Sequence, residues 1–247
     1  MTDHSSAKKK PKHPALKTPY FGVQERLVSS NKLIFIFTGW GSRVSQYAYF
    51  VRQLNKKGYA CIIYDYPDHV AMDGDLDEYR RMYDEVIADA QSRLAVLKRS
   101  GFTHFSAYGY SLGTLIANKF TRDTPEVTHV VLNLTYGDIA RTVWKYKGVK
   151  KAKENLIKRG YTEQAVRNFV TFADPVHNAK GLKGKKVLLY LAKNDRVLRH
   201  QFTQKTKEAL ELHDVDFLYI ENKYLGHVLG GVKNMLRTST LLDFLSK

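Results

Sequence analysis

The sequence predicts an α/β protein with a mostly parallel sheet of about six to seven strands flanked by helices. Short continuous apolar runs, typical of strands buried on both faces, alternate along the chain with helical stretches of ten or more residues. This alternation requires crossover connections, and such connections join parallel strands. The chain has 247 residues, of which 43% are hydrophobic, so one domain of this class can bury a sizeable core.

The strands are expected where the apolar runs occur. Residues 33–37 form the first core strand, and residues 21–28 form a short edge strand before it. A turn-forming Thr38-Gly39-Trp40-Gly41 stretch follows the first core strand. Further strands are expected at 60–64, 104–108, 127–134, 186–191 and 216–220.

The helices are expected between these strands. Residues 46–57 have apolar positions at helical spacing, and Gly58 ends the helix as a C-cap. Residues 76–99 carry a long apolar stripe at the same spacing. Three more helices are expected at 112–120, 201–210 and 228–245.

Two segments do not fit this alternation of strands and helices. Residues 1–18 are basic, with a Lys8-Lys9-Lys10-Pro11-Lys12 run and almost no apolar residues, so we expect a flexible arm before a folded domain at 19–247. Residues 138–180 are rich in Lys and Arg and look helical in pieces, at 141–158 and 163–172. They are too long for a simple loop and predict a small helical cap inserted in the domain.

The net charge and the cysteine content limit which partners and which cellular compartment are expected. The net charge of +16 would suit an acidic substrate or an anionic surface, although a solvated basic surface explains it equally simply; we do not expect nucleic acid as the partner. No apolar run reaches the roughly 20 residues that span a bilayer, and no apolar stretch of a secretory signal follows the basic N-terminus. The single cysteine, Cys61, lies in an apolar run and is interpreted as a buried hydrophobe rather than a catalytic thiol. A cytoplasmic location is expected.

The chemistry is indicated by residues 109–113, Gly-Tyr-Ser-Leu-Gly, which join an expected strand directly to an expected helix. This is the context of a G-x-S-x-G nucleophile elbow. The glycines at 109 and 113 are required because side chains there would collide with the neighbouring strand and helix. The turn lifts the Ser111 hydroxyl above the sheet edge, where the helix N-terminus favours developing negative charge.

A serine nucleophile needs a base, and the base needs an acid that orients it. Asp195 follows the strand at 186–191, and His227 follows the strand at 216–220, so both are expected at the same edge of the sheet as Ser111. Asp138 is the alternative acid, and His177 and His200 are weaker candidates for the base. The segment 65–69 contains two aspartates and a histidine, but its spacing fits no metal site, and we interpret it as a turn.

These motifs resemble those of the α/β-hydrolase superfamily over about residues 30–245. The resemblance implies Ser111 as nucleophile, His227 as general base and then acid, and Asp195 as the residue that orients the histidine. It also implies an oxyanion hole from the backbone N–H groups of Leu112 and Trp40. The chain departs from the family at Thr38-Gly39, where members usually have His-Gly. The donor there is a backbone group, so the change need not disable the site.

The expected function is therefore a serine hydrolase of the carboxylesterase or lipase kind, which cleaves a small-molecule carboxylic ester through an acyl-enzyme and needs no cofactor or metal. Thioesterase, acyltransferase and peptidase activities use the same chemistry, and a catalytically idle domain used for binding is the alternative of a different class. In the expected cap, aromatic residues line an acyl pocket or form the cap's own core, and basic residues meet an anionic substrate or surface or form a solvated face. These aromatic residues are Trp144, Tyr146, Tyr161, Phe169 and Phe172, and the basic ones are Arg141, Lys145, Lys147, Lys150, Lys151 and Lys153.

Overall fold

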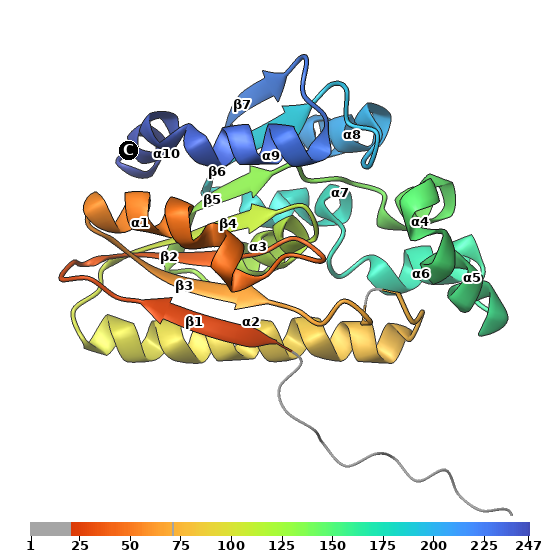
Figure 1. The fold of residues 1–247 in the computed structure, drawn as a ribbon, viewed down its shortest axis with the longest axis horizontal. Coiled ribbons are helices and arrows are strands. Elements are labelled where there is room, and N and C mark those ends of the chain that lie inside the picture. The colour runs from red at the N-terminus through yellow and green to blue at the C-terminus, as the bar shows by residue number, and fades with distance from the viewer. Residues whose placement is uncertain (1–20, 71) are drawn as a thin grey trace, which may run out of the picture.

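Seven strands form one sheet in the order β1-β3-β2-β4-β5-β6-β7 (Figure 1). The computed structural model describes residues 21–70 and 72–247, so the predicted arm at 1–18 lies outside the described residues. Only β1 runs antiparallel to its neighbour, β3, and all other pairs are parallel. The predicted fold class is confirmed. The strands are β1 (Gly22–Arg26), β2 (Lys32–Phe37), β3 (Tyr59–Asp65), β4 (His104–Tyr110), β5 (Val127–Asn133), β6 (Lys186–Ala192) and β7 (Asp216–Asn222).

The strand order reverses at β2. The chain passes from β2 to β3 on one side and then returns to place β4 on the other side. In open parallel sheets, such a switch point leaves a crevice at the carboxyl ends of the strands. The residues that follow β2 and β4, beginning at Thr38 and Ser111, therefore lie next to each other at this edge.

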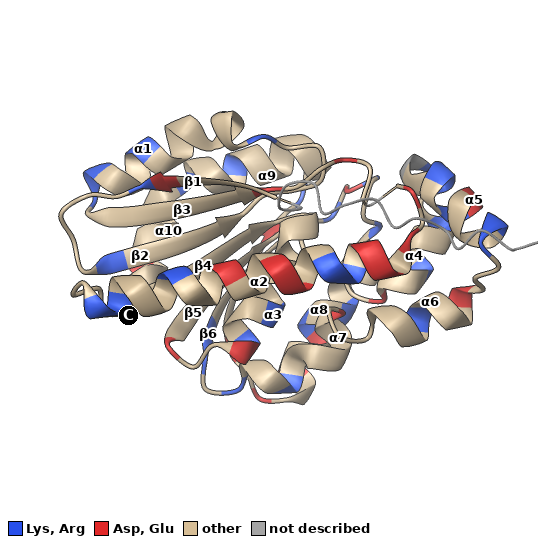
Figure 2. Ribbon diagram, turned by 90° about the horizontal axis from the view of Figure 1, so that it is seen from below, with Lys and Arg blue, Asp and Glu red and all other residues tan. Residues whose placement is uncertain are grey.

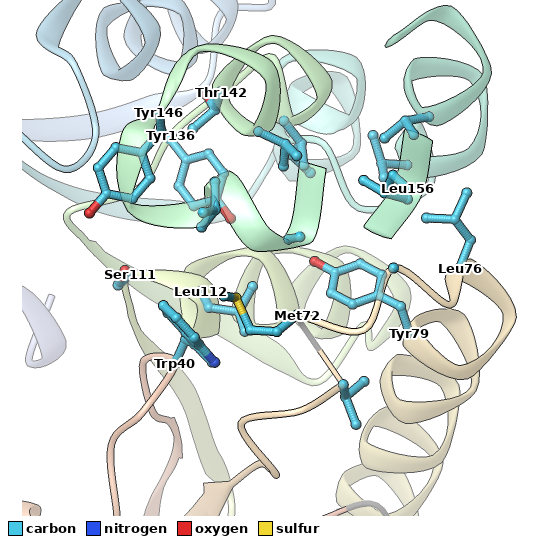
Figure 3. Close-up of a pocket in the computed structure, with 18 of the residues that line it drawn as sticks. Trp40, Met72, Leu76, Tyr79, Ser111, Leu112, Tyr136, Thr142, Tyr146 and Leu156 are labelled. Carbon is cyan, nitrogen blue, oxygen red and sulfur yellow. The ribbon is translucent and has the colours of Figure 1, made fainter. Parts of the chain in front are cut away.

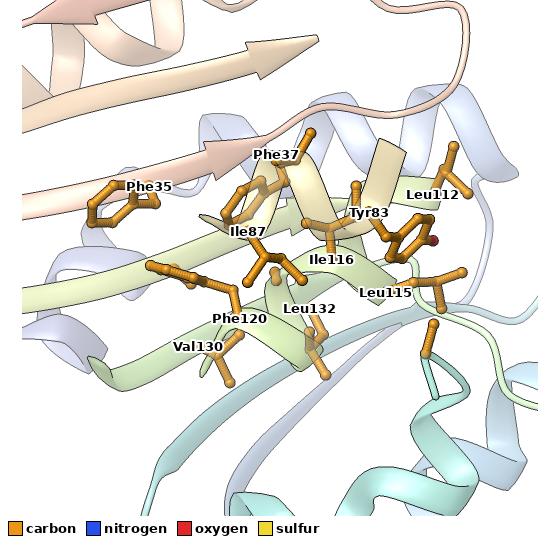
Figure 4. Close-up of a cluster of buried hydrophobic side chains, with 14 of the residues drawn as sticks. Phe35, Phe37, Tyr83, Ile87, Leu112, Leu115, Ile116, Phe120, Val130 and Leu132 are labelled. Carbon is orange, nitrogen blue, oxygen red and sulfur yellow. The ribbon is translucent and has the colours of Figure 1, made fainter. Parts of the chain in front are cut away.

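Helices cover both faces of the sheet. Side chains of β2 alternate, so that Phe35 and Phe37 face α2 and α3 while Ile34 and Ile36 face α1 and α10. On the first face, the Phe120 ring of α3 meets the ring of Phe35 edge-on, with 4.9 Å between the ring centroids (Figure 4). The core helices are α1 (Ala48–Lys56), α2 (Leu76–Arg99), α3 (Leu112–Asp123), α8 (His200–Leu212), α9 (His227–Leu236) and α10 (Thr238–Leu245).

Two predicted helices differ from the structure. The helix expected at 46–57 begins as a 3-10 turn at Val44–Tyr47 before α1. The single helix expected at 228–245 is wrong, because Arg237 has ψ 53° and separates α9 from α10. The break redirects the chain so that Leu241 and Phe244 of α10 pack against the sheet. None of the helices in the described part of the chain is both long enough and apolar enough to cross a membrane.

The segment between β5 and β6 is helical in pieces. Figure 1 shows α4, α5 and α6 beside the carboxyl end of the sheet, whereas α7 lies close to the core helices. Figure 2 shows Lys and Arg residues, in blue, on the helices α4 and α5 of this projecting part. The elements are α4 (Ile139–Lys145), a 3-10 turn (Lys147–Val149), α5 (Lys150–Lys158), α6 (Glu163–Val170), α7 (Pro175–Asn178) and a second 3-10 turn (Ala179–Leu182).

A buried polar network joins α9 to the sheet. The Asn133 side-chain amide donates hydrogen bonds to the Tyr108 hydroxyl (2.7 Å) and the Gly231 carbonyl (3.1 Å). The Asn234 amide donates to the side-chain oxygen Oδ1 of Asn133 (2.9 Å). Buried polar groups are costly without partners. This network therefore fixes the position of α9 over β4 and β5, and with it the position of His227, the first residue of α9.

Replacing Asn133 with leucine should destabilise the protein by about 2–3 kcal/mol, because the Asn234 amide and the Gly231 carbonyl lose their partners. Asn118 offers a matched control, since it is equally buried and its amide has no hydrogen-bond partner among the described protein groups. Asn118→Leu should cost less than Asn133→Leu in the free energy of urea unfolding. Equal losses for the two variants would contradict this role of the network.

Candidate active site

Ser111 occupies the sharp turn between β4 and α3. Its backbone has φ 50° and ψ −118°, and it is the N-cap of α3. A non-glycine residue with positive φ costs of order 1–3 kcal/mol and is found mainly at functional sites. The Ser111 N–H donates to the Asn133 carbonyl at 2.9 Å, which ties the turn to β5. The strained turn holds the hydroxyl at the start of a helix.

The two glycines of the motif allow this turn for the expected reason. A Cβ on Gly109 would lie 2.5 Å from the Thr114 Cα, and a Cβ on Gly113 would lie 2.4 Å from the Thr38 carbonyl oxygen. Backbone cannot yield as the end of a flexible side chain can. The first turn of α3 therefore packs directly on the end of β2 only because these positions lack side chains.

The three residues predicted to act together lie in one line of hydrogen bonds. His227 Nδ1 is 2.7 Å from Asp195 Oδ2, and His227 Nε2 is 2.9 Å from Ser111 Oγ. The other Asp195 oxygen accepts the backbone N–H groups of Val197 and Leu198, both at 2.8 Å. Because an ionised carboxylate only accepts hydrogen bonds, Asp195 favours the proton on Nδ1 and leaves the Nε2 lone pair for the serine hydroxyl.

The loops that carry Asp195 and His227 are joined to each other. The Lys193 N–H donates to the Asn222 carbonyl (2.8 Å), and the Asn194 amide donates to the Lys223 carbonyl (2.9 Å). The Asn222 side-chain oxygen accepts the Leu225 N–H, which shapes the turn before His227. These bonds hold the acid and the histidine in a fixed relation before any substrate is present.

Tyr110 packs against His227, a contact that the sequence did not reveal. Its ring stacks on the imidazole with a centroid separation of 5.7 Å and an interplanar angle of 28°. A Cβ on Gly39 would lie 2.8 Å from the Tyr110 ring, and a Cβ on Gly231 would overlap the ring from α9. Burial and the nearby negative charge of Asp195 raise the pKa of Tyr110 to about 12. The motif placed Tyr110 beside the serine, but the direction of its side chain depends on α9, which is distant in sequence.

The expected oxyanion donors, Leu112 and Trp40, both border the cavity that Ser111 lines. Leu112 is the first residue of α3, so its N–H has no acceptor within the helix. Trp40 follows β2, and its indole Nε1 donates to the Asp68 carbonyl at 3.0 Å, which holds the turn. Ser111, Leu112 and Trp40 line the same cavity (Figure 3).

The weaker candidates for the acid and the base lie elsewhere. Asp138 forms ion pairs with Lys205 (2.6 Å) and Arg167 (2.5 Å). Burial acts to raise the pKa of Asp138, but the hydrogen bonds from Lys205 and Arg167 outweigh it, so the pKa is lowered. His200 pairs with Glu221 at 2.6 Å.

Neither a catalytic thiol nor a metal cluster is present in the described part of the chain. Cys61 is fully buried, and burial raises the pKa of its thiol to about 12. In the segment 65–69, Asp68 pairs with Arg43 and His69 approaches Glu78 at 3.7 Å. Among the described residues, no group of three or more potential ligands could hold a metal ion.

An apolar cavity of about 140 Å³ runs from Ser111 toward α5. In Figure 3, Trp40, Ser111 and Leu112 lie at one end, and Leu76 and Leu156 lie at the other. The walls come from the loop before α2, from α2 itself and from the helices between β5 and β6. The apolar lining residues include Val70, Met72, Leu76, Tyr79, Tyr136, Ile139, Val143, Tyr146, Val149, Ala152, Leu156, Val166, Val170, Val197 and Leu198.

Most of the aromatic and basic residues singled out between β5 and β6 do not line this cavity. Of the five aromatic residues, only Tyr146 does. The other four pack against the main hydrophobic cluster; they are Trp144, Tyr161, Phe169 and Phe172. Arg141 pairs with Glu163, and none of the six basic residues is among those that line the cavity. Met72 and the first turn of α2, which do line it, carry no sequence signal beyond apolarity.

Comparison with known proteins agrees with this fold. Residues 29–141 match the family model described as serine aminopeptidase, S33. The Pyrococcus furiosus esterase superimposes with a TM-score of 0.64 at 17% identity, and the alignment covers 96% of each chain. The chain therefore has the α/β-hydrolase fold. No curated protein matches this chain in sequence.

Two further solved structures show how widely this fold is shared. A carboxyl esterase from Bacillus coagulans has a TM-score of 0.63 at 10% identity, with 92% of each chain covered. The acylaminoacyl peptidase of Pyrococcus horikoshii has a TM-score of 0.70 at 13% identity over 92% of this chain. The chain spans only 39% of the length of that peptidase.

Two adjacent glycines of α9 test the confinement of Tyr110. Gly231→Ala should destabilise the protein by about 1–3 kcal/mol, because the new methyl group overlaps a ring that cannot move away. Gly230→Ala should be neutral or stabilise the protein by up to about 1 kcal/mol, since its Cβ would meet only an ordinary contact, 3.5 Å from the Ala192 Cβ. Thermal unfolding of the two variants measures the difference, and equal midpoints would show that Tyr110 is not confined.

Proposed function

We propose that this α/β-hydrolase is a serine hydrolase that cleaves carboxylic esters with a short or medium apolar acyl group. The observation that carries the proposal is the continuous hydrogen-bond chain Asp195–His227–Ser111 at the mouth of an apolar cavity. A binding domain has no need for a serine, a histidine and a buried carboxylate in this order. Of the alternatives, thioesters and acyl transfer would use the same steps with another leaving group or acceptor.

The reaction follows from the geometry. Ser111 Oγ attacks the ester carbonyl while its proton passes to His227 Nε2. Asp195 stabilises the imidazolium through the bond to Nδ1. The N–H groups of Leu112 and Trp40 bind the developing oxyanion, which is worth about 3–4 kcal/mol for one such donor. His227 then returns the proton to the leaving alcohol, and water releases the acid in a second cycle through the same groups.

The lining of the cavity favours an apolar acyl group over the free N-terminus of a peptide. An aminopeptidase must bind an ammonium group, and a carboxylate is the usual partner for it. Among the described lining residues, Asp75 is the only carboxylate. Its oxygens already accept the Glu78 N–H and pair with Arg159.

The helices at 138–180 act in this proposal as a cap, as the sequence predicts, and α4, α5 and α6 form the outer wall of the acyl site. The volume of about 140 Å³ is comparable with apolar cavities of roughly 150 Å³ that accept a benzene ring. A short or medium chain therefore fills it, and the anionic substrate that the basic residues suggested is not required.

Kinetics on a p-nitrophenyl ester test the assignment of the three residues. Ser111→Ala and His227→Ala should lower kcat by about 10⁴-fold or more, and Asp195→Asn by on the order of 10⁴-fold, because the imidazole loses its orienting partner. Asp138→Asn is the matched control. It should leave kcat within about tenfold and instead cost about 1–3 kcal/mol in stability, as its two cations lose their charged partner. A loss of activity in Asp138→Asn that equals that in Asp195→Asn would overturn the assignment.

Chain-length preference tests the acyl site. The parent enzyme should gain up to about fourfold in kcat/KM per added methylene until the cavity is full, since each buried methylene contributes about 0.8 kcal/mol. Ala152→Phe, which fills the part of the cavity formed by α5, should lower kcat/KM for an octanoyl ester at least tenfold and leave the acetyl ester within about twofold. Equal effects on both esters would show that the acyl chain lies elsewhere.

A further inference from the structure

Helix α9 exposes an unusual row of apolar side chains. Val228, Leu229, Val232 and Leu236 are 64%, 65%, 44% and 55% exposed. Their spacing places them within about a 100° arc of the helix, because successive residues are rotated by 100°. Tyr224, in the turn before the helix, is 84% exposed. We call these five residues the α9 patch.

The inner side of α9 explains why these residues cannot turn inward. Gly231 and Asn234 bond to Asn133, and His227 bonds to Asp195 and Ser111. Rotation of the helix would break all of these bonds. The patch is therefore held outward by the same contacts that hold the histidine, and contiguous exposed apolar surface of this kind marks an interaction site.

The patch begins beside the candidate active site. Tyr224 and Val228 line a surface hollow together with Asp195 and His227. Val197 lines both this hollow and the acyl cavity. A surface that covers the α9 patch would therefore lie next to the mouth through which an apolar chain reaches Ser111.

Basic residues surround the patch. Lys193 and Arg196 line the same hollow as Tyr224 and Val228, and Lys223 precedes Tyr224. Lys233 lies on α9, and Arg237 ends it. Among the described residues, none of these five cations has a carboxylate oxygen within 4 Å. The nearby Glu221 carboxylate is held by His200 and Tyr219.

This combination favours one partner over the others. A helix with an apolar face and flanking cations lies well at the interface of an anionic membrane, where the side chains enter the headgroup region and the cations meet phosphate. A second copy of this chain would oppose the same cations to each other, on molecules that each carry a net charge of +16. We infer that the α9 patch docks the protein on an anionic lipid surface, beside the mouth of the acyl cavity.

The test measures binding without catalysis and so does not depend on the proposed function. Full-length Ser111→Ala protein is sedimented with vesicles of phosphatidylcholine alone or mixed with phosphatidylglycerol. The protein should bind the anionic vesicles, and the variant that also carries Leu229→Ser, Val232→Ser and Leu236→Ser should bind on the order of 100-fold more weakly. These side chains are exposed, so circular dichroism and thermal unfolding should remain those of the parent.

A second triple variant controls for a general loss of apolar surface. Val96→Ser, Ile157→Ser and Leu212→Ser remove exposed apolar side chains from α2, α5 and α8, and should leave vesicle binding within about twofold. Equal binding by the α9 variant and its parent would overturn the inference, even if the basic N-terminal residues attract the vesicles. So would a parent dimer in size-exclusion chromatography that the α9 variant converts to a monomer, because a second copy would then cover the patch.

Discussion

The direct packing of Gly113 on the end of β2 is the constraint on which the rest of the site depends. Only a residue without a side chain lets the first turn of α3 approach the carbonyls of Phe37 and Thr38. That approach places Ser111 in a strained turn at a helix N-terminus, beside the cavity that Leu112 and Trp40 also line. The switch in strand order at β2 provides the crevice in which this contact can form.

The opposite wall of the site depends on α9. Asn133 and Asn234 fix the helix on the sheet, and Gly231 leaves room for the Tyr110 ring, which in turn stacks on His227. The histidine is thus positioned by groups on β4, β5 and α9 as well as by Asp195. The same contacts turn the apolar side chains of α9 outward. The proposed docking surface and the proposed catalytic histidine, His227, are therefore held in place by the same hydrogen bonds of α9.

The sequence was sufficient where a local pattern determines the structure. Apolar runs predicted the described strands β2 to β7, and the glycines around Ser111 predicted the elbow, because each depends on residues close in sequence. Strand ends also placed Asp195 and His227 at one edge. The break at Arg237 and the direction of Tyr110 could not be predicted, since each depends on packing between distant elements. For the same reason, the sequence could not show that Tyr146 is the only one of the five predicted cap aromatics that lines the cavity. The sequence also could not show that the apolar side chains of α9 are exposed, because a buried helix would carry the same apolar residues.

Covalent labelling shows whether Ser111 is an activated nucleophile. The protein is incubated with a fluorophosphonate, digested, and examined by mass spectrometry. We expect one phosphonylated peptide, with the adduct on Ser111, and much slower labelling when His227 is replaced by alanine. A folded protein that remains unlabelled, or one labelled on another residue at the same rate with and without His227, would contradict it.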